Sequence, residues 1–354
     1  MVSADVLSDL LRNVRLRGAL FFHVDGQAPW VAEAPAACDI LQAVMPAAEH
    51  MIEFHGIIEG SCWAALVGEP PVRLHAGDIV LFPQGDPHVM SSAPGMRAEQ
   101  VDLSLYFAAR PSQLPFRLRV GDPAPPGGRP GAAGHDSATL VCGFLGCDAR
   151  PYNPLLSALP RVLHMPGAAA GDRSWMGQFM RTAVEESGGR RPGGEAVLER
   201  MSELMFVDVL RRHADTLSGE QTGWLAGMRD PGVGRVLALL HARPSEPWTI
   251  EGLGEEAGLS RSVLHERFMH FIGTPPMQYL TQWRMQLAAA RLRESDDKVL
   301  EIALDVGYES EAAFARAFRR LVGDSPGAWR RARRQTAKAK RATAAPLEAS
   351  ESGR

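Results

Sequence analysis

The stretch LGEEAGLSRSVLHERFMHFIGTPPMQYL, at residues 253–280, is matched by IALDVGYESEAAFARAFRRLVGDSPGAWR, at residues 302–330, and this internal match decides the fold of the C-terminal part. The two stretches align at an offset of 49 residues as far as a shared glycine and of 50 residues beyond it. The aligned pairs include Leu253 with Ile302, Gly258 with Gly307, Ser260 with Ser310, Phe268 with Phe318, Gly273 with Gly323 and Pro276 with Pro326. A repeat of two helix-sized segments predicts a duplicated supersecondary unit.

Each copy of the repeat has the pattern of two helices joined by a tight turn. Gly258 and Gly307 come just after the first helix, where a left-handed residue is expected and glycine adopts that conformation at the least cost. Ser260 and Ser310 then stand where the second helix needs an N-cap. The pattern predicts a helix-turn-helix, whose second helix enters the major groove of DNA. A long helix from Pro276 to Glu294 is expected to join the two copies.

The part from residue 228 to residue 332 resembles the AraC/XylS family of bacterial transcription regulators, most specifically in DVGYESEAAFARAFRRLVGDSPGAWRR at 305–331. The resemblance implies that two recognition helices contact the bases of double-stranded promoter DNA while flanking residues contact phosphate. Carried over position by position, the implied DNA-contacting residues are Arg261, Ser262, His265, Glu266 and Arg267 in the first copy, and Ser310, Glu311, Ala312, Ala313, Arg316 and Arg320 in the second.

Two positions depart from the family pattern. Glu266 stands where a basic or amide residue is common, and a carboxylate can accept a hydrogen bond from cytosine N4 but repels phosphate. In the second copy Arg316 is the main candidate for a guanine or phosphate contact, because the neighbouring positions hold a glutamate and two alanines. We therefore expect the first copy to carry more of the base discrimination. The arginines Arg319, Arg320, Arg330, Arg331, Arg333 and Arg334 are expected to contact the DNA backbone or to form a solvated face.

The first 120 residues consist of short apolar runs punctuated by Gly and Pro. The runs are HMIEFHGII at 50–58, CWAALVG at 62–68, DIVLFP at 78–83 and EQVDLSLYFAA at 99–109. Their spacing predicts the strands of an all-β barrel or sandwich. A further strand is expected at LVCGFLGC, residues 140–147, and short helical structure at 153–165. The Gly- and Pro-rich segment Gly121–Ala138 is expected to be a mobile loop.

The segment GDIVLFPQGDPH fits the pattern G-x5-P-x-G-x2-H and ends at His88. It resembles the second motif of the cupin barrel, which implies that His88 points into the barrel. The first cupin motif is incomplete here, because it offers only His55, with Glu53 two residues before it and Glu59 four residues after it. A site made of His55, His88 and either a carboxylate such as Glu59 or Cys62 would suit zinc or ferrous iron. The alternative is a lumen that holds a small organic ligand or only packed side chains.

Cys142 belongs to the phrase Cys142-Gly143-Phe144, which is followed by the PLLSALP of residues 154–160. This pair of phrases resembles the AraC-type regulators whose N-terminal half is a cupin-like ligand-binding domain. Cys142 is a candidate redox sensor with Cys62 or Cys147 as the resolving cysteine. The alternative is a small buried strand residue.

Two helices are expected between the barrel and the repeat, at Asp172–Ser187 and Glu195–Leu217. The predicted apolar stripe of the second helix consists of Val197, Leu198, Met201, Leu204, Met205, Val209 and Leu210. This stripe either packs on its own domain or forms a homodimer. The predicted organisation is a sensor domain at 1–165, a helical linker or dimerisation region at 166–224, a DNA-binding domain at 225–334 and a disordered tail at 335–354.

The composition of the 354 residues, with 45% hydrophobic and 22% charged residues, is that of an ordinary soluble protein of about two domains. The net charge of −3 divides into +4 from residue 225 onward and −7 before it, which weakly favours a nucleic-acid partner. There is no signal-peptide layout, no membrane span of ~18 apolar residues, and no disulfide framework among the four cysteines. We therefore expect a cytoplasmic protein with reduced thiols and no membrane partner.

The fold class that follows is α+β multidomain, with a cupin-like β-barrel and an all-α domain of two helix-turn-helix motifs. The predicted function is a DNA-binding transcription regulator that senses a small molecule or a redox signal, acts as a homodimer and has RNA polymerase as a further partner. No G-x-S-x-G, G-x4-G-K-[ST] or G-x-G-x-x-G motif supports catalysis. Two alternatives remain: a cupin metalloenzyme with a vestigial helical domain, and a constitutive regulator whose barrel only dimerises it.

Overall fold

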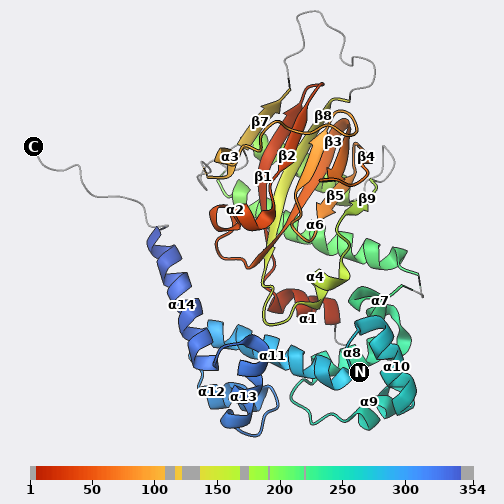
Figure 1. Ribbon diagram of the computed structural model, residues 1–354, viewed down its shortest axis with the longest axis vertical. Helices are drawn as coiled ribbons and strands as arrows, with labels where there is room; N and C mark the ends of the chain where they lie inside the picture. The colour runs from red at the N-terminus through yellow and green to blue at the C-terminus, as the bar shows by residue number, and fades with distance from the viewer. Residues whose placement is uncertain are drawn as a thin grey trace, which may run out of the picture. The chain divides into compact units, whose positions relative to one another are not determined.

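A curled sheet forms most of the first of two units in the computed structural model (Figure 1). This sheet unit comprises residues 14–149 and 154–221, and the helical unit comprises residues 1–13, 150–153 and 222–354. The structure describes residues 5–107, 116–121, 136–167, 175–189, 192–218 and 221–343. A β-rich N-terminal part and a helical C-terminal part confirm the predicted α+β class. The units are interleaved along the chain, whereas the predicted domain boundaries follow it continuously.

The sheet contains nine strands within the described residues. They are β1 Arg17–Gly26, β2 Val31–Ala34, β3 His50–Leu66, β4 Val72–His75, β5 Ile79–Phe82, β6 His88–Ser91, β7 Phe116–Val120, β8 Ala138–Cys147 and β9 Leu163–Met165. The hydrogen-bonded path runs β2-β6-β3-β8-β1-β7, with β4, β5 and β9 off this path. All pairs are antiparallel except β1 with β7. Because the 17-residue β3 pairs with β4, β5, β6 and β8, it curls the sheet into a half-barrel.

The two strands predicted at 50–58 and 62–68 form one continuous strand, β3. Between them the pairing register with β8 shifts, and Gly60 has a φ of 77°. A bulge bends a strand without ending it, so the glycine that suggested a turn marks a bend instead. A Cβ at Gly60 would lie 2.0 Å from the carbonyl oxygen of Ser137, so a side chain does not fit there.

Several predicted N-terminal elements differ from the structure. Within the run predicted as a strand at 99–109, the described residues 99–107 form no strand and contain the helix α3, Ser104–Phe107, whose first backbone N–H donates to the Asp102 carboxylate at 2.9 Å. The helices α1 Val6–Asn13 and α2 Ala37–Val44 lie where only strands were expected. A short helix, α4 Pro154–Ala158, is confirmed, but it is followed by strand β9. Most of the predicted mobile loop, residues 122–135, lies outside the described residues.

Helices α5 Trp175–Gly189 and α6 Gly194–Thr216 confirm the two helices expected after the barrel, and α6 packs on β1. The predicted stripe on α6 was partly wrong, because Val197 and Leu204 are 42% and 56% exposed whereas Phe206 is buried. The buried face instead consists of Gly194, Leu198, Ser202, Met205, Phe206, Val209 and Leu210. Gly18 of β1 allows this close approach, since a Cβ there would lie 2.6 Å from the carbonyl oxygen of Glu199.

The helical unit contains α1 and eight further helices within the described residues. They are α7 Trp224–Arg229, α8 Pro231–Ala242, α9 Ile250–Ala257, α10 Arg261–Ile272, α11 Pro276–Glu294, α12 Val299–Asp305, α13 Glu311–Val322 and α14 Pro326–Thr343. The predicted helix from Pro276 to Glu294 is confirmed with the same bounds as α11. Helix α14 continues past residue 335, where the disordered tail was predicted to begin. No described helix has the length and apolar content that a membrane span requires.

Gln286 of α11 explains why the helical unit contains two segments from elsewhere in the chain. Its side chain is buried, donates to the carbonyl oxygen of Asn13 at 2.9 Å and accepts from the backbone N–H of Tyr152 at 3.1 Å. Asn13 is the last residue of α1, and the Tyr152 ring contacts the Tyr279 ring edge-on at a centroid distance of 5.7 Å. A single amide therefore satisfies the backbone of both segments.

Candidate nucleic-acid interface and buried cavity

Helices α9 and α10 form the first predicted helix-turn-helix. Gly258 ends α9 with a φ of 69°, and the hydroxyl of Ser260 accepts from the backbone N–H of Val263 at 3.4 Å, as expected of a C-cap and an N-cap. Leu264 and Phe268 of α10 are fully buried. The opposite face is solvent-exposed and carries the predicted base-reading residues Ser262, His265 and Glu266. The sequence therefore placed this surface correctly, while the DNA contacts themselves stay a prediction.

The two arginines predicted to contact DNA from α10 already have partners in the protein. Arg261 pairs with Glu251 of α9 at 2.8 Å, and both side chains are largely exposed. Arg267 pairs with the buried carboxylate of Asp230. Asp230 is also the N-cap of α8, where it accepts from the N–H of Val233 at 2.8 Å. Arg267 therefore helps to hold α8 against α10.

Helices α12 and α13 form the second helix-turn-helix. Gly307 follows α12 with a φ of 84°, and the hydroxyl of Ser310 accepts from the backbone N–H of Ala313 at 3.3 Å, so Ser310 acts as an N-cap. Phe314 and Phe318 are fully buried. The other predicted DNA-contacting residues lie on the exposed or half-exposed face and are Glu311, Ala312, Ala313, Arg316 and Arg320. In the part of the chain that the structure describes, Arg316 forms no hydrogen bond or ion pair.

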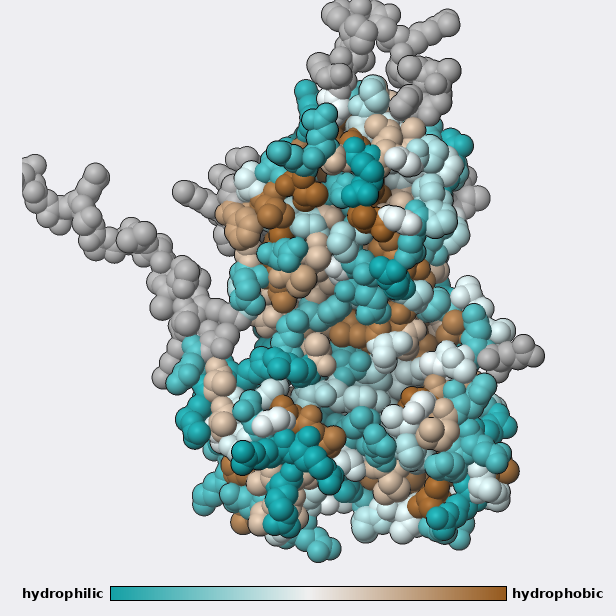
Figure 2. Space-filling model, in the orientation of Figure 1, coloured by the Kyte–Doolittle hydropathy of each residue, from teal (hydrophilic) through white to brown (hydrophobic). Residues whose placement is uncertain are grey.

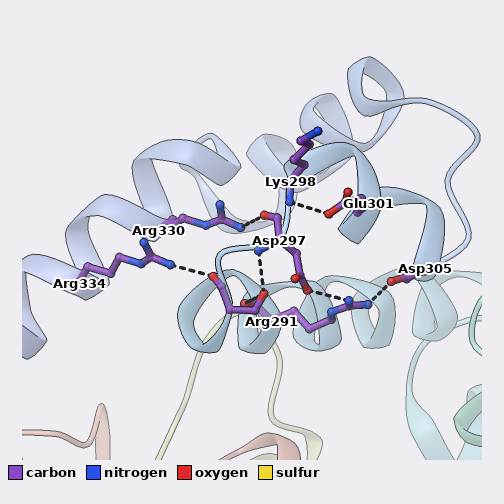
Figure 3. A network of polar contacts seen from close by, with 8 residues as sticks. Arg291, Asp297, Lys298, Glu301, Asp305, Arg330 and Arg334 are labelled. Atoms are coloured by element: carbon purple, nitrogen blue, oxygen red, sulfur yellow. Dashed lines mark hydrogen bonds and ion pairs between the residues drawn. The ribbon is translucent and has the colours of Figure 1, made fainter.

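Arg330 and Arg334 of α14 hold the turn between α11 and α12 (Figure 3). Arg330 donates to the carbonyl oxygens of Leu292 and Asp297 at 3.2 and 2.6 Å. Arg334 donates to the carbonyl oxygen of Ser295 at 2.8 Å. The end of a helix leaves carbonyl groups without intrahelical partners, and Arg330 satisfies one of these at Leu292. The other two bonds are to carbonyl groups of the turn itself. The sequence prediction that both arginines face DNA or solvent missed this function, since nothing in the local pattern indicates a partner about 38 residues away.

A cavity of about 200 Å³ opens in the sheet unit. It is lined by Phe22, Val24, Val31, Ala32, Glu33, Ala34, Glu53, His55, His88, Met90, Ala98, Gln100, Asp102, Leu105, Tyr106, Leu118, Val120, Leu140, Cys142, Gly143 and Phe144. Apolar surface is visible around α3 on the face shown in Figure 2, where Leu103, Leu105 and Phe107 are partly exposed. Of the predicted ligand-binding residues, the structure brings His55 and His88 into the lining together with Cys142. Cys62 is buried and Glu59 is exposed, and neither lines the cavity.

A chain of hydrogen bonds crosses the floor of the cavity. The Nδ1 of His88 lies 3.0 Å from the carbonyl oxygen of Asp86 and must donate to it, which leaves the Nε2 of His88 as an acceptor. The Nε2 of His55 lies 2.7 Å from that atom and therefore donates to it. The Nδ1 of His55 then accepts from the thiol of Cys142, at 2.8 Å. All four imidazole nitrogens are thus occupied, and burial lowers the pKa of both histidines, that of His88 to about 4.

Glu53 is the one carboxyl group deep in this cavity. Its Oε1 is buried without a hydrogen-bond partner, and its Oε2 lies 3.8 Å from the Nε2 of His88, beyond hydrogen-bond distance. Burial raises the pKa of Glu53 to about 8, so the group is largely protonated at neutral pH. A buried polar atom without a partner costs on the order of 1–3 kcal/mol, which a bound molecule could recover by hydrogen bonding.

The hydrogen-bonded pair of histidines does not have the spacing of two zinc ligands. The two Nε2 atoms lie 2.7 Å apart, whereas two nitrogens bound at ~2.0–2.1 Å to one tetrahedral metal would lie about 3.3 Å apart. Among the described residues, no group of three or more His, Cys, Asp and Glu side chains is arranged to hold a metal ion. The residues as placed do not fit the predicted zinc or iron site, which measurement of bound metal would test.

Cys142, the residue predicted from the sequence as a candidate redox sensor, lies in the cavity lining. Its thiol is buried, and burial together with Cys62 and Glu53 raises the pKa of Cys142 well above its usual value. A thiol with a raised pKa holds little of the reactive thiolate. Among the residues that the structure describes, no disulfide bond joins the cysteines, which are Cys38, Cys62, Cys142 and Cys147. The structure therefore gives Cys142 a place in the hydrogen-bond chain, and its oxidation stays a prediction.

The aromatic wall of the cavity was missed in the sequence. The ring of Tyr106 contacts the rings of Phe22 and Phe144 edge-on, with centroid distances of 5.6 and 6.3 Å. Tyr106 belongs to α3, which was predicted to be a strand. An aromatic residue next to the Asp102-x-Ser104 capping pattern could have indicated a short helix placed over the barrel mouth.

Comparisons with known proteins agree with these two parts of the chain. Residues 5–215 match the family described as Cupin, and residues 253–332 match the family described as Helix-turn-helix domain. A protein of Streptomyces lividans described as an AraC-like transcription regulator is 31% identical over 92% of this chain and 98% of its own length. The transcriptional regulator AlkR of Acinetobacter baylyi is 26% identical over 92% of this chain and 99% of its own length. The solved DNA-binding domain of AdpA in complex with a target DNA is 35% identical, covering 30% of this chain and 95% of that domain, with a TM-score of 0.29.

Proposed function

The chain belongs to the AraC-type transcription regulators with an N-terminal cupin domain, and on this basis we propose that a small molecule in the cavity of the sheet unit controls how the two helix-turn-helices bind promoter DNA. The DNA-binding part of this function follows from the family. The proposal adds the small-molecule signal and its site. It also adds that the chain is a regulator and not an enzyme, which the transcription regulators among its relatives support.

The observation that carries the DNA-binding function is the pair of capped helices α10 and α13, which present exposed polar faces over buried apolar ones. The 19-residue helix α11 connects the two motifs along the chain. At 1.5 Å per residue, α11 is about 28 Å long, which is comparable to the ~34 Å between successive major grooves on one side of DNA. The two motifs are therefore suited to neighbouring grooves.

The first experiment maps the DNA sites that the full-length protein occupies in its host and then measures binding to one of them by fluorescence anisotropy. Affinity should fall steeply as salt rises, because binding releases counterions from DNA. Arg316→Ala should weaken binding about tenfold. Arg200→Ala, on α6 in the sheet unit, is the matched control and should bind like the native protein. Binding that does not depend on salt, or the absence of any bound site, would refute the function.

The small-molecule signal is tested on the same DNA. A molecule that binds the cavity should change the affinity of the full-length protein for its promoter, because the two binding equilibria are linked. Unchanged DNA affinity at a saturating concentration of a bound molecule would instead favour a constitutive regulator whose sheet unit only dimerises it. Contact with RNA polymerase is part of the proposal, and transcription from the mapped promoter in a purified system tests it.

We also propose that the protein acts as a homodimer through the outward face of α6. Val197 and Leu204 lie seven residues apart, hence on one face of the helix, and are 42% and 56% exposed. Leu204→Glu should lower the dimer fraction measured by analytical ultracentrifugation, because it places a charge in the apolar contact. Arg181→Glu, on the exposed side of α5, is the control. A native protein that is monomeric at high concentration would exclude the homodimer.

A further inference from the structure

The charges around the cavity indicate which molecules it can accept. No lysine or arginine is among the described residues that line it. The lining acids are Glu33, Glu53 and Asp102, and Glu33 is already paired with Arg97 at 2.7 Å. The imidazole nitrogens of the two histidines are all occupied by the hydrogen-bond chain. A bound anion would therefore lose its hydration without meeting a positive group, which is a large cost.

We propose that this cavity binds a small organic cation, an amine that carries an apolar or aromatic group, with Glu53 as its counter-ion. The Oε1 of Glu53 is buried, has no hydrogen-bond partner and belongs to the cavity lining, so an ammonium group can donate to it. An ammonium bound to a carboxylate forms a charge-assisted hydrogen bond, which is stronger than a neutral one. The inference rests on the proposed function, because it takes the cavity to be the effector site.

The aromatic wall supports the same class of ligand. The rings of Phe22, Tyr106 and Phe144 follow one another in edge-on contacts, and all three line the cavity that contains Glu53. Aromatic faces attract organic cations and also bury apolar groups. The cavity volume of about 200 Å³ suits a ligand of roughly ten non-hydrogen atoms, the size of an arylalkylamine.

The ammonium group pairs with the carboxylate form of Glu53, so a proton held by this carboxyl group passes to solvent when the cation binds.

The test uses the full-length protein and three probes of matched shape: 2-phenylethylammonium, neutral 2-phenylethanol and anionic phenylacetate. Calorimetric titration should show the cation binding at least tenfold more tightly than the other two. Equal binding of the neutral probe, a preference for the anion, or no binding of any probe would each overturn the proposal.

Variants locate the binding site and separate this inference from the proposed function. Glu53→Gln keeps the shape of the side chain and should lose the preference for the cation. Glu59→Gln is the control, because Glu59 is an exposed residue of the same strand that does not line the cavity. A preference that survives Glu53→Gln would overturn the assignment of the counter-ion. The affinity for promoter DNA is measured on the same preparations. If the native protein does not bind the promoter, the proposed function is refuted. If it binds the promoter but shows no preference for the cation, only this inference is refuted.

Discussion

Arg267 lies on the recognition helix α10, yet its guanidinium pairs with the carboxylate of Asp230, which is buried and caps α8. A family resemblance assigns such an arginine to DNA, whereas the structure also gives it a role in stability. The two roles compete for one guanidinium group. By contrast, Arg261 of the same helix pairs with a carboxylate that is itself largely exposed, so its ion pair contributes little.

Arg267→Ala should lower the free energy of unfolding by about 1 kcal/mol, because it leaves a buried carboxylate without its charged partner. The figure is reduced from that of a fully buried pair because the Arg267 side chain is 46% exposed. Urea denaturation of the full-length protein measures the change. Arg261→Ala is the matched control on the same helix and should change stability by less than about 0.5 kcal/mol. Equal effects of the two variants would contradict this interpretation.

Glu53 should make stability fall as pH rises. Its pKa in the folded state is raised by burial to about 8, above the ordinary value of 4.5, so the folded state binds more protons than the unfolded state between these pH values. The cost is absent below about pH 4.5, grows with pH, and is complete above about pH 8. Glu53→Gln should remove this cost. The unfolding free energy of the variant minus that of the native protein should therefore be larger at pH 8 than at pH 5, by on the order of 3 kcal/mol.

The measurement is the difference in unfolding free energy between Glu53→Gln and the native protein at several pH values. Taking the difference matters, because His55 and His88 have lowered pKa values and act in the opposite direction, removing stability as pH falls below about 6.5. A difference that does not change between pH 5 and pH 8 would mean that Glu53 is ionised in the folded protein.

Helix α14 supports the second helix-turn-helix by hydrogen bonds from its arginines to backbone carbonyl groups. Arg330 and Arg334 donate to one carbonyl oxygen in the last turn of α11 and to two in the turn that precedes α12 (Figure 3). Arg291 of α11 pairs with Asp297 of that turn at 2.7 Å and with Asp305 at the end of α12. The orientation of α12, and with it the position of α13, depends on this turn. Arginines that flank a DNA-binding motif can thus shape the motif rather than contact the DNA.

Arg330→Ala should lower the free energy of unfolding by about 1–2 kcal/mol, since it removes two hydrogen bonds to backbone carbonyl groups. It should also weaken promoter binding by disturbing the turn before α12. Arg331→Ala is the control for loss of a positive charge at the neighbouring, exposed position. If the two variants lose DNA affinity equally and neither loses stability, then Arg330 acts on DNA by charge alone.

The elements also show how far the sequence could be interpreted. Local rules fixed the repeat: the N-caps Ser260 and Ser310, the glycines after α9 and α12, and the bounds of α11 all follow from residues within one turn. The elements of the sheet unit could not be predicted in this way, because they depend on contacts between residues that are far apart in the sequence. Whether Gly60 ends a strand or bends it, and which face of α6 is buried, are decided by pairing with β8 and by packing on β1.

In the candidate cavity too, some residues could be predicted from local motifs, whereas their contacts could not. A motif of 12 residues identified His88, and the incomplete first cupin motif identified His55. The hydrogen-bond partners of their ring nitrogens, Asp86 and Cys142, could not be predicted from these motifs. The aromatic wall could not be predicted because α3 was taken for a strand.

On the scale of the whole molecule, the helical unit is assembled from three segments of the chain. The side-chain amide of Gln286 contacts both of the other segments, because its two backbone partners belong to α1 and to residues 150–153. A fragment of residues 222–354 alone lacks both partners and would leave the buried amide of Gln286 without them. The fragment should therefore unfold at a lower temperature than the same unit in the full-length protein, and differential scanning calorimetry measures this difference.

The control adds back one segment, as a peptide of residues 5–13 supplied to the fragment. It should raise the unfolding temperature in proportion to its binding, because a ligand of the folded state stabilises it. A fragment as stable as the intact unit would show that Gln286 does not need these partners.

The interleaved origin of the helical unit also limits how such a regulator can be recombined. A DNA-binding part encoded by one continuous stretch of gene can be joined to a new sensor by a single crossover. Here the strands of the sheet unit lie in the sequence between the three segments of the helical unit. A single crossover at residue 222 would therefore take α1 and residues 150–153 from another protein. Functional chimeras should therefore be obtained when Asn13, Tyr152 and Gln286 are exchanged together with the segments that carry them.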